Sequence, residues 1–213
     1  MKVLLDSVTT NLTRFFRNTA HFSAFENYII PDIIKIKKLS NQKKIRLWSA
    51  GCSTGEEPYT MAMILKEKLL PAYSFEIIGS DLSLKSLMTA QEGFYPQGRI
   101  GGVPEHYLKK YFDRKHDGYQ IKEGIKRIVK FDYHNLKFDS GLQDIDIIFC
   151  RNVLIYFDAA AQKAVIKRFW KVMNKYSYLV IGHSESLFGM ESQFEFVKTE
   201  WATFYRKFLN SRE

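Results

Sequence analysis

The chain of 213 residues has few cysteines and no long apolar run. Its two cysteines, Cys52 and Cys150, stand near the ends of predicted buried strands, so we expect free thiols. C-x-x-C pairs and paired histidines are missing, and we therefore expect no metal site. No apolar run approaches the roughly 20 residues of a membrane helix, and the N-terminal MKVLLDSVTT lacks the apolar length of a secretory signal. These absences argue against membrane insertion and favour a cytoplasmic protein.

Positive charge is the strongest bias in the composition. Lys and Arg number 32 against 23 Asp and Glu, a formal net charge of +9. Such a chain calls for an acidic partner, which could be nucleic acid, a membrane surface or a negatively charged protein. No aromatic RNA-reading motif or zinc finger is present, and we expect no stable nucleic-acid complex. With 46% apolar residues, the chain can bury the core of one compact α/β domain.

A glycine-bounded loop follows the first predicted strand, Ile45 to Ala50, and precedes a helix predicted from about Glu57 to Leu70. Gly51 and Gly55 allow a sharp turn and close approach to a ligand. In α/β proteins, ligands bind at this end of a strand. Glu56 and Glu57 at the helix start would repel phosphate and suit a cationic or hydroxyl-bearing ligand. S-adenosylmethionine fits this demand better than a nucleoside triphosphate.

Asp81 ends the second predicted strand, Phe75 to Gly79 with Ser80 and Asp81 at its tip. A carboxylate at this place can accept hydrogen bonds from two neighbouring ribose hydroxyls. The same residue can instead serve as a turn or capping residue for the helix predicted from about Ser83 to Glu92. Both interpretations stay open at the level of sequence.

The glycine loop also matches the G-x-S-x-G pattern of a hydrolase nucleophile elbow. The chain order Ser53, Asp146, His183 agrees with that class. The loop follows the first strand, however, and no earlier strand is left to supply the second oxyanion-hole amide. A plain strand-to-helix turn without any ligand is the other alternative for this loop taken by itself.

The remaining pattern predicts a doubly wound, mostly parallel α/β sheet. Residues 11 to 38 read as helices broken at Pro31, within an N-terminal helical segment 1–40 that precedes the main domain 41–213. A β insert at about 117–130 is expected to form short antiparallel strands that could capture an extended peptide, although a plain surface hairpin explains it equally well. The later predicted elements are strands at 128–131, 146–150 and 178–182, a helix at 159–174, and an antiparallel pair at 194–197 and 203–208.

Several segments together resemble one known family. They are Asn11-Leu-Thr-Arg-Phe-Phe-Arg17, Trp48-Ser-Ala-Gly-Cys-Ser-Thr-Gly-Glu-Glu-Pro-Tyr59, Ser80-Asp81, Phe149-Cys-Arg-Asn-Val-Leu-Ile-Tyr-Phe-Asp158 and Gly182-His-Ser-Glu185. In this order they resemble the CheR-type chemotaxis receptor methyltransferases over nearly the whole chain. The resemblance implies a class I S-adenosylmethionine methyltransferase fold. It also implies methyl transfer from S-adenosylmethionine to glutamate side chains of chemoreceptors, with S-adenosylhomocysteine as the product.

The same resemblance implies a set of site residues. Those expected to bind the cofactor are Asn11, Thr13, Arg17, Gly51, Glu57 at the methionine ammonium, Asp81 at the ribose, Asn135 and Leu136 beside the adenine, Arg151 and Asn152. Those expected to take part in catalysis are Arg17, Tyr156 near the transferring methyl, and Arg114, which resembles a second functional arginine close to the cofactor or the acceptor.

The implied partner is the set of methyl-accepting cytoplasmic helices of a chemoreceptor, whose acidic side chains suit the positive charge of this chain. Family members usually carry a separate helical domain ahead of the first motif, whereas only residues 1–10 precede it here. This leaves the acceptor less determined than the cofactor. The alternatives are a cofactor-binding scaffold without turnover, or a methyltransferase acting on another acidic protein or on nucleic acid. The last lacks an Asn-Pro-Pro-Tyr type loop after the fourth strand, where Arg151-Asn-Val-Leu stands instead.

Overall fold

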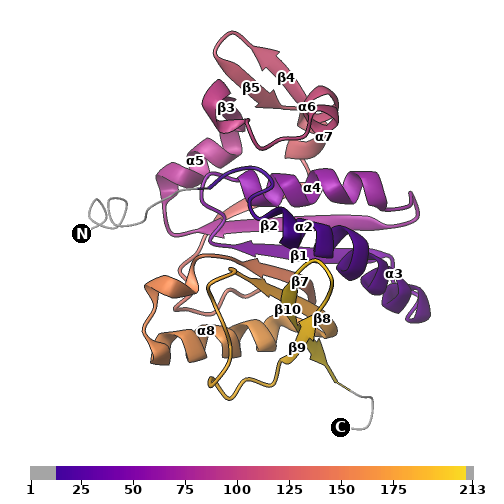
Figure 1. Cartoon of the computed structure of the whole chain (residues 1–213), viewed down its shortest axis with the longest axis vertical. Helices are drawn as coiled ribbons and strands as arrows, with labels where there is room; N and C mark the ends of the chain where they lie inside the picture. Colours follow the sequence, from indigo (N-terminus) through magenta and orange to yellow (C-terminus); the bar gives the residue numbers. More distant parts are fainter. Residues whose placement is uncertain (1–12, 210–213) are drawn as a thin grey trace.

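A seven-stranded sheet forms the centre of the fold, in a computed structural model that describes residues 13–209 (Figure 1). Its strands lie in the order β6-β2-β1-β7-β8-β10-β9. In this spatial order, β6, β2, β1, β7 and β8 are parallel to one another. Strand β10 pairs antiparallel with β8, and β9 pairs antiparallel with β10. Their bounds are β1 Lys44–Ala50, β2 Ser74–Asp81, β6 Val129–Tyr133, β7 Ile145–Cys150, β8 Met173–Ile181, β9 Glu195–Lys198 and β10 Thr203–Phe208. The predicted mostly parallel α/β sheet is confirmed.

The strand order reverses between β1 and β7. From β1 the chain passes through α4 (Glu56–Lys68) to β2 and α5 (Leu84–Glu92), and it reaches β6 on the same side. From β7 it passes through η3 (Leu154–Tyr156) and α8 (Ala159–Val172) to β8 on the other side. In open α/β sheets, such a reversal leaves a crevice outside the carboxyl ends of the two strands. This crevice is where the structure assembles the predicted site.

Helices cover both faces of the large sheet, because alternate residues of each strand point to opposite faces. In β7, Ile147 and Phe149 join the core beneath α4 and the N-terminal helices, whereas Ile148 and Cys150 join the core beneath α8. Every residue of β7 is buried, as its almost wholly apolar sequence predicts, and Asp146 is the one charged residue among them. Figure 1 shows α4, α2 and α3 on one side of the sheet and α8 on the other.

The N-terminal helices are continuous where the sequence predicts a break. Helix α2 (Thr19–Ala24) runs into the π-helical turn η1 (Phe25–Ile29) and then into α3 (Ile30–Leu39). The predicted break at Pro31 is therefore wrong. Pro31 stands two residues after the π-helical turn η1, whose altered hydrogen-bond spacing lets the helix continue past a residue without an N–H. Phe22, Phe25 and Ile33 from this segment belong to the same core as the sheet.

The β insert is larger than predicted and begins earlier. It is a three-stranded antiparallel sheet of order β3-β5-β4, with β3 at Phe94–Pro96, β4 at Phe112–Lys115 and β5 at Gly118–Ile121. Helices η2 (Gln97–Arg99) and α6 (Glu105–Tyr111) connect β3 with β4, and α7 (Glu123–Lys126) follows β5. The predicted antiparallel insert is confirmed, but its predicted range 117–130 contains only one of its three strands, β5, and residues 123–126 are helical. The start at Phe94 escaped prediction because β3 pairs with a strand distant in sequence.

One strand of the large sheet also begins before its predicted start. Strand β8 starts at Met173, directly after α8, rather than at Tyr178. Asn174 and Lys175 are polar, so the apolar pattern alone did not include them. The pairing of Ser177 with Lys207 and of Tyr176 with Phe208 holds this first part of the strand in the sheet. Within residues 13–209, no helix combines the length and the apolar character needed to cross a bilayer.

Candidate functional site

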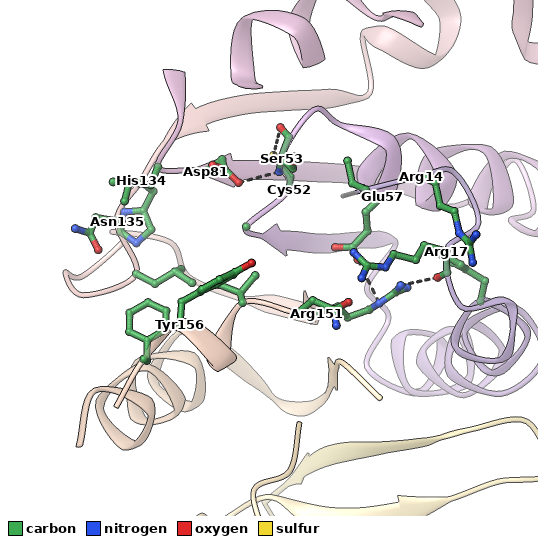
Figure 2. A pocket seen from close by; sticks show the side chains of 18 residues that line it. Arg14, Arg17, Cys52, Ser53, Glu57, Asp81, His134, Asn135, Arg151 and Tyr156 are labelled. Carbon is green, nitrogen blue, oxygen red and sulfur yellow. Dashed lines mark hydrogen bonds and ion pairs between the residues drawn. The ribbon is translucent and has the colours of Figure 1, made fainter. Parts of the chain in front are cut away.

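A pocket lies at the carboxyl ends of β1, β2 and β7, and Figure 2 shows the side chains that line it. Its walls come from segments that are far apart in sequence. The lining residues are Thr13, Arg14, Arg17, Phe22, Gly51, Cys52, Ser53, Glu57, Asp81, Leu82, His134, Asn135, Leu136, Arg151, Asn152, Val153, Tyr156 and Phe157. All predicted site residues except Asn11 and Arg114 belong to this set.

The two exceptions differ in kind. Asn11 lies outside the described residues. Arg114 is exposed on β4 of the small sheet, where it pairs with Tyr119, and it does not line the pocket. The structure therefore does not bring Arg114 to the cofactor side of the site. Arg14, three residues before Arg17 in the first motif, lines the pocket instead.

Asp81 both shapes the glycine loop and faces the pocket. Its Oδ2 accepts a hydrogen bond from the backbone N–H of Ser53 at 2.8 Å, and its Oδ1 accepts one from Ser83 N–H at 2.9 Å. The turn role and the ligand role, which the sequence left as alternatives, are thus compatible. The helix-capping role belongs to Ser83, whose hydroxyl accepts from Ser86 N–H at the start of α5.

The glycine loop is built from backbone that tolerates little change. Gly51 has φ +84°, and a Cβ there would lie 2.4 Å from Cγ2 of Val153. The N–H groups of Gly51 and Cys52 both donate to Ser80 O, at 2.8 and 2.9 Å, which ties the loop to the end of β2. Ser53 adopts φ +50°, and its buried Oγ has no hydrogen-bond partner among the described residues. An unpartnered buried hydroxyl on a pocket wall is a ready donor to a ligand.

Glu57 is one of the two acidic residues that line the pocket, with Asp81. Ser49 Oγ donates to its Oε1 at 2.7 Å, and Arg151 Nε lies 3.5 Å from its Oε2. Burial raises the pKa of the Glu57 carboxyl, and the Arg151 guanidinium and the Ser49 hydroxyl oppose this shift. The Glu57 carboxyl group faces the pocket beyond the end of β1, where its ionised form can bind a cation (Figure 2).

Glu56 does not share this role. The prediction that both acidic residues meet the ligand is wrong for Glu56, which is fully buried on the side of the β insert. Thr54 Oγ1 donates to its Oε2 at 2.7 Å, and Arg99 Nη2 of η2 lies 3.2 Å from its Oε1. Burial raises its pKa, while Thr54 and Arg99 oppose the rise. Consecutive helical residues point about 100° apart, so neighbours in sequence serve different surroundings.

Arg151 provides a buried cation next to Glu57. Its Nη2 donates to the backbone oxygen of Arg17, and its guanidinium carbon lies 5.2 Å from the centre of the Phe22 ring. Nε and Nη1 are buried without a hydrogen-bond partner in the described part of the chain. Burial lowers the pKa of Arg151, and Glu57 opposes that shift. Adjacent anionic and cationic groups with spare hydrogen-bonding capacity suit the ammonium and carboxylate of an amino acid.

His21 is a buried residue close enough to Arg151 for that cation to affect its pKa. It is 4% exposed, and its Nδ1 has no hydrogen-bond partner among residues 13–209. Burial, with help from the Arg151 cation, lowers the pKa of His21 to about 4. The imidazole is therefore neutral at physiological pH and adds no charge to the pocket.

The loop from Arg151 to Tyr156 is held by a residue for which the sequence gave no role. Glu185, at the end of the Gly182-His-Ser-Glu185 motif, accepts hydrogen bonds from Asn152 N–H at 2.9 Å, Val153 N–H at 3.0 Å and Ile155 N–H at 3.3 Å. The same carboxylate accepts from Gly182 N–H. Asn152 adopts φ +58°, an unfavourable conformation that these bonds compensate. The signal was the motif itself, which places an acidic residue four positions after the end of the buried strand β8.

Tyr156 stands at the mouth of the pocket. It is 51% exposed, and Figure 2 shows its ring between the pocket and the outside. The wall near Asn135 and Leu136 also includes Leu82, His134 and Phe157, none of which the sequence singled out. Burial lowers the pKa of His134, so this wall is uncharged. A wall lined by apolar side chains and an amide suits an aromatic base.

The structure separates the residues of the hydrolase alternative. Asp146 lies near the start of β7, where its Oδ2 accepts from Arg46 N–H at 2.9 Å and its Oδ1 lies 2.8 Å from Lys37 Nζ. Ser53 follows the opposite end of β1, more than about 13 Å away at 3.3 Å per strand residue. Asp146 therefore cannot orient a histidine for Ser53. No group of three His, Cys, Asp or Glu side chains within 13–209 has the arrangement of a metal site.

Several known proteins are similar in sequence to this chain. The family model described as the CheR methyltransferase, SAM binding domain, matches residues 11–203. A chemotaxis protein methyltransferase of Borreliella burgdorferi is 42% identical over 193 residues, covering 87% of this chain and 68% of that protein. Chemotaxis protein methyltransferase 2 of Vibrio cholerae is 32% identical over 213 residues, covering 97% and 73%. Among solved structures, magnesium protoporphyrin IX methyltransferase from Synechocystis PCC 6803 aligns over 95% of this chain and 88% of its own, at TM-score 0.44 and 13% identity.

Proposed function

Because the chain belongs to the CheR methyltransferase family, we propose that it transfers a methyl group from S-adenosylmethionine to glutamate side chains of chemoreceptors. The products are glutamate methyl esters and S-adenosylhomocysteine, and the reaction takes place in the cytoplasm. One observation carries the proposal. The residues of the described chain that the family resemblance assigns to the cofactor all line a single pocket at the reversal point of the sheet, although they arise from segments between Thr13 and Asn152.

The donor set of the pocket fits this cofactor. Glu57 would hold the ammonium of the methionine part and Arg151 its carboxylate, because each has a charge of the required sign and lies beside the other. Asp81 would accept from the ribose hydroxyls, and Asn135 with Leu136 would flank the adenine. The bound cofactor supplies an electrophilic methyl group on a sulfonium sulfur.

The acceptor needs positioning rather than activation. A glutamate side chain has a pKa near 4.3 and is already ionised at neutral pH, so the residues of the site need not remove a proton. Aligning the carboxylate with the methyl group is a contribution that can reach several kcal/mol. Tyr156, half-exposed at the mouth, can orient the carboxylate through its hydroxyl, and Arg17 can attract it. Exposure of Tyr156 suits an acceptor that is part of a protein.

The partner is proposed to be the cytoplasmic helical region of a chemoreceptor. Its acidic side chains would complement the net charge of +9. The β insert offers a second contact, since β3 and β4 are the edge strands of the small sheet and an extended receptor peptide can add to such an edge. Arg114 on β4 would then act on the acceptor side, away from the cofactor pocket.

The test is methyl transfer to receptor-bearing membranes from S-adenosylmethionine labelled in its methyl group. We expect base-labile methyl esters on receptor glutamates, and a reduction of about 10- to 100-fold for Glu57→Gln at limiting cofactor. Absence of base-labile label with the parent chain would contradict the acceptor assignment. If calorimetry still detected cofactor binding in that case, the chain would be a cofactor-binding scaffold rather than an enzyme.

A further inference from the structure

A second groove lies outside the cofactor pocket, between α8 and the segment that leads from β8 to β9. We call it the basic groove, because four cationic side chains of α8 line it against two acidic ones from outside that helix. The α8 side is lined by Lys163, Ile166, Lys167, Arg168, Trp170 and Lys171, and the other side by Asp139, Met190, Glu191, Ser192, Gln193 and Phe194. Figure 1 shows α8 on the face of the large sheet opposite to α4. No predicted site residue lines this groove.

Positive charge follows one edge of the basic groove. Lys163, Lys167 and Lys171 stand four residues apart on α8 and are all exposed. In the described part of the chain, Lys163 and Lys167 have no ion-pair partner, and Lys171 lies 3.5 Å from the exposed carboxylate of Asp139. An exposed pair at that distance contributes little, so the lysines remain available to a partner. Residues at i, i+4 and i+8 form a row along one side of a helix.

The floor of the basic groove is apolar. Ile166 and Phe194 are buried, and the Trp170 and Phe194 rings meet edge to face with centroids 4.9 Å apart. Trp170 is held from behind by Lys207, whose Nζ lies 4.8 Å from the ring centre and donates to Trp170 O at 2.7 Å. An apolar floor beside a lysine row is the complement of an amphipathic helix with acidic residues along one side.

We propose that the basic groove binds an acidic amphipathic helix of the acceptor protein, which lies alongside α8. Carboxylates one turn apart on that helix would match the lysine row, whose ends are about 12 Å apart at 1.5 Å per residue. The proposal rests on the proposed function in taking the chemoreceptor as that acceptor. It adds a docking surface on the main domain, separate from the β insert.

The position of α8 links the groove to the chemistry. The helix begins at Ala159, three residues after Tyr156, which ends the η3 turn. Gln162 Nε2 donates to Leu154 O and Phe157 O, both at 3.0 Å, and so joins the first turn of α8 to the mouth of the cofactor pocket. A helix docked along α8 therefore extends toward the mouth, where a neighbouring segment of the acceptor protein can present a glutamate to Tyr156.

The experiment compares two double charge reversals of equal size. Lys163→Glu with Lys167→Glu changes the groove, and Lys35→Glu with Lys38→Glu changes exposed lysines on α3, on the opposite face of the sheet. We expect the groove variant to raise the KM for receptor-bearing membranes by about tenfold, since two favourable contacts become repulsive. Its dissociation constant for S-adenosylhomocysteine, measured by calorimetry, should equal that of the parent. The α3 variant should change neither quantity by more than about twofold.

Co-sedimentation with membranes separates the remaining outcomes. Binding to receptor-bearing membranes that the groove variant loses, without methylation by the parent, would keep the groove and refute the proposed function. Methylation that is equal in the parent and the groove variant would overturn the groove and keep the function. Equal losses of binding in the groove variant and the α3 variant would mean that only the net charge of the protein matters, and they would also overturn the groove proposal. Groove-dependent binding to receptor-free phosphatidylglycerol vesicles would overturn it in favour of an anionic membrane surface.

Discussion

At the scale of single residues, the site depends on a pair of opposite charges kept out of water. Glu57 and Arg151 lie close enough for each charge to offset part of the free-energy cost of burying the other. Arg151 nevertheless keeps buried N–H groups that have no hydrogen-bond partner in the described chain. Leaving such groups unsatisfied costs free energy. A ligand that supplies both an ammonium and a carboxylate would offset that cost, which is the physical basis for assigning the amino-acid end of the cofactor to this place.

Lowering the pH should weaken cofactor binding through Glu57. Burial raises the pKa of this carboxyl, so it takes up a proton at a higher pH than an exposed glutamate. Only the ionised form attracts the ammonium, and affinity for S-adenosylhomocysteine should fall as the pH goes from 7 to 5. The pKa of His21 is lowered to about 4, so its neutral form persists over this window. Calorimetry across the pH range measures the effect.

The control for this prediction is Glu57→Gln, which cannot titrate. It should bind about 10- to 100-fold more weakly than the parent at pH 7 and show a flat pH profile. A parent profile that is equally flat would mean that Glu57 does not meet the ammonium.

Removal of the Asp81 side chain should weaken cofactor binding by about 1 to 3 kcal/mol, the range for hydrogen bonds to a charged group. Part of this loss reflects the loop, because Asp81 also accepts from Ser53 N–H and Ser83 N–H. Calorimetry should therefore include Asp81→Asn beside Asp81→Ala. The asparagine keeps one acceptor oxygen and should retain an intermediate affinity. Equal binding by the parent and the alanine variant would remove Asp81 from the site.

At the scale of elements, the loop after β7 is organised from outside itself. Four backbone N–H groups, three from the loop and one from Gly182, donate to the Glu185 carboxylate. The loop carries Arg151, Asn152 and Tyr156, so the position of all three depends on one half-buried carboxylate. Glu185 is a positioning residue, because it does not line the pocket.

Glu185→Gln should lower both cofactor affinity and kcat. The amide replaces one acceptor oxygen by an NH₂ group, which faces N–H donors and repels them, so the loop loses its conformation. We expect a loss of about tenfold or more in affinity for S-adenosylhomocysteine, measured by calorimetry, together with a lower kcat at saturating substrates. The exposed neighbour provides the control, as Ser184→Ala should behave like the parent. An unaltered kcat and affinity in the glutamine variant would show that the loop holds its shape alone.

Elements could be predicted where local sequence decides them, and not where distant contacts do. The apolar run of β7 predicted a buried strand, and the antiparallel strand 203–208 was predicted with its observed bounds. Pro31 failed as a break because the π-helical turn before it accommodates the ring. The start of the β insert was not predicted, because β3 pairs with a strand that is distant in sequence: Tyr95 in β3 faces Tyr119 in β5. The close approach of Gly118 to Tyr95 O likewise appears only in three dimensions.

At the scale of the whole molecule, the two ends of the parallel strands have different roles. The pocket lies at their carboxyl ends. Near their amino ends, a buried ion pair between Lys37 Nζ and Asp146 Oδ1, 2.8 Å apart, joins α3 to β7. Asn174 and Arg46 N–H complete the hydrogen bonds of Asp146. The charge pattern of α3 did not predict that Lys37 alone among its lysines is buried, because burial follows from the packing of the helix against the sheet.

Lys37→Met should destabilise the fold without affecting the pocket. It leaves Asp146 buried without its cation, which costs about 3 kcal/mol in the free energy of unfolding. Urea unfolding measures this change, and calorimetry should find the cofactor affinity of the folded variant unchanged. Lys38→Met on the exposed side should alter stability by no more than about 0.5 kcal/mol. Similar losses in both variants would mean that the buried pair has no special role.

The crystal structure of this chain with S-adenosylhomocysteine is the most direct test of the central claim. The account predicts density in the pocket at the carboxyl ends of β1, β2 and β7, with the sugar beside Asp81, the amino-acid group between Glu57 and Arg151, and the base beside Asn135. A pocket without ligand density at saturating S-adenosylhomocysteine, or ligand bound elsewhere on the chain, would contradict it.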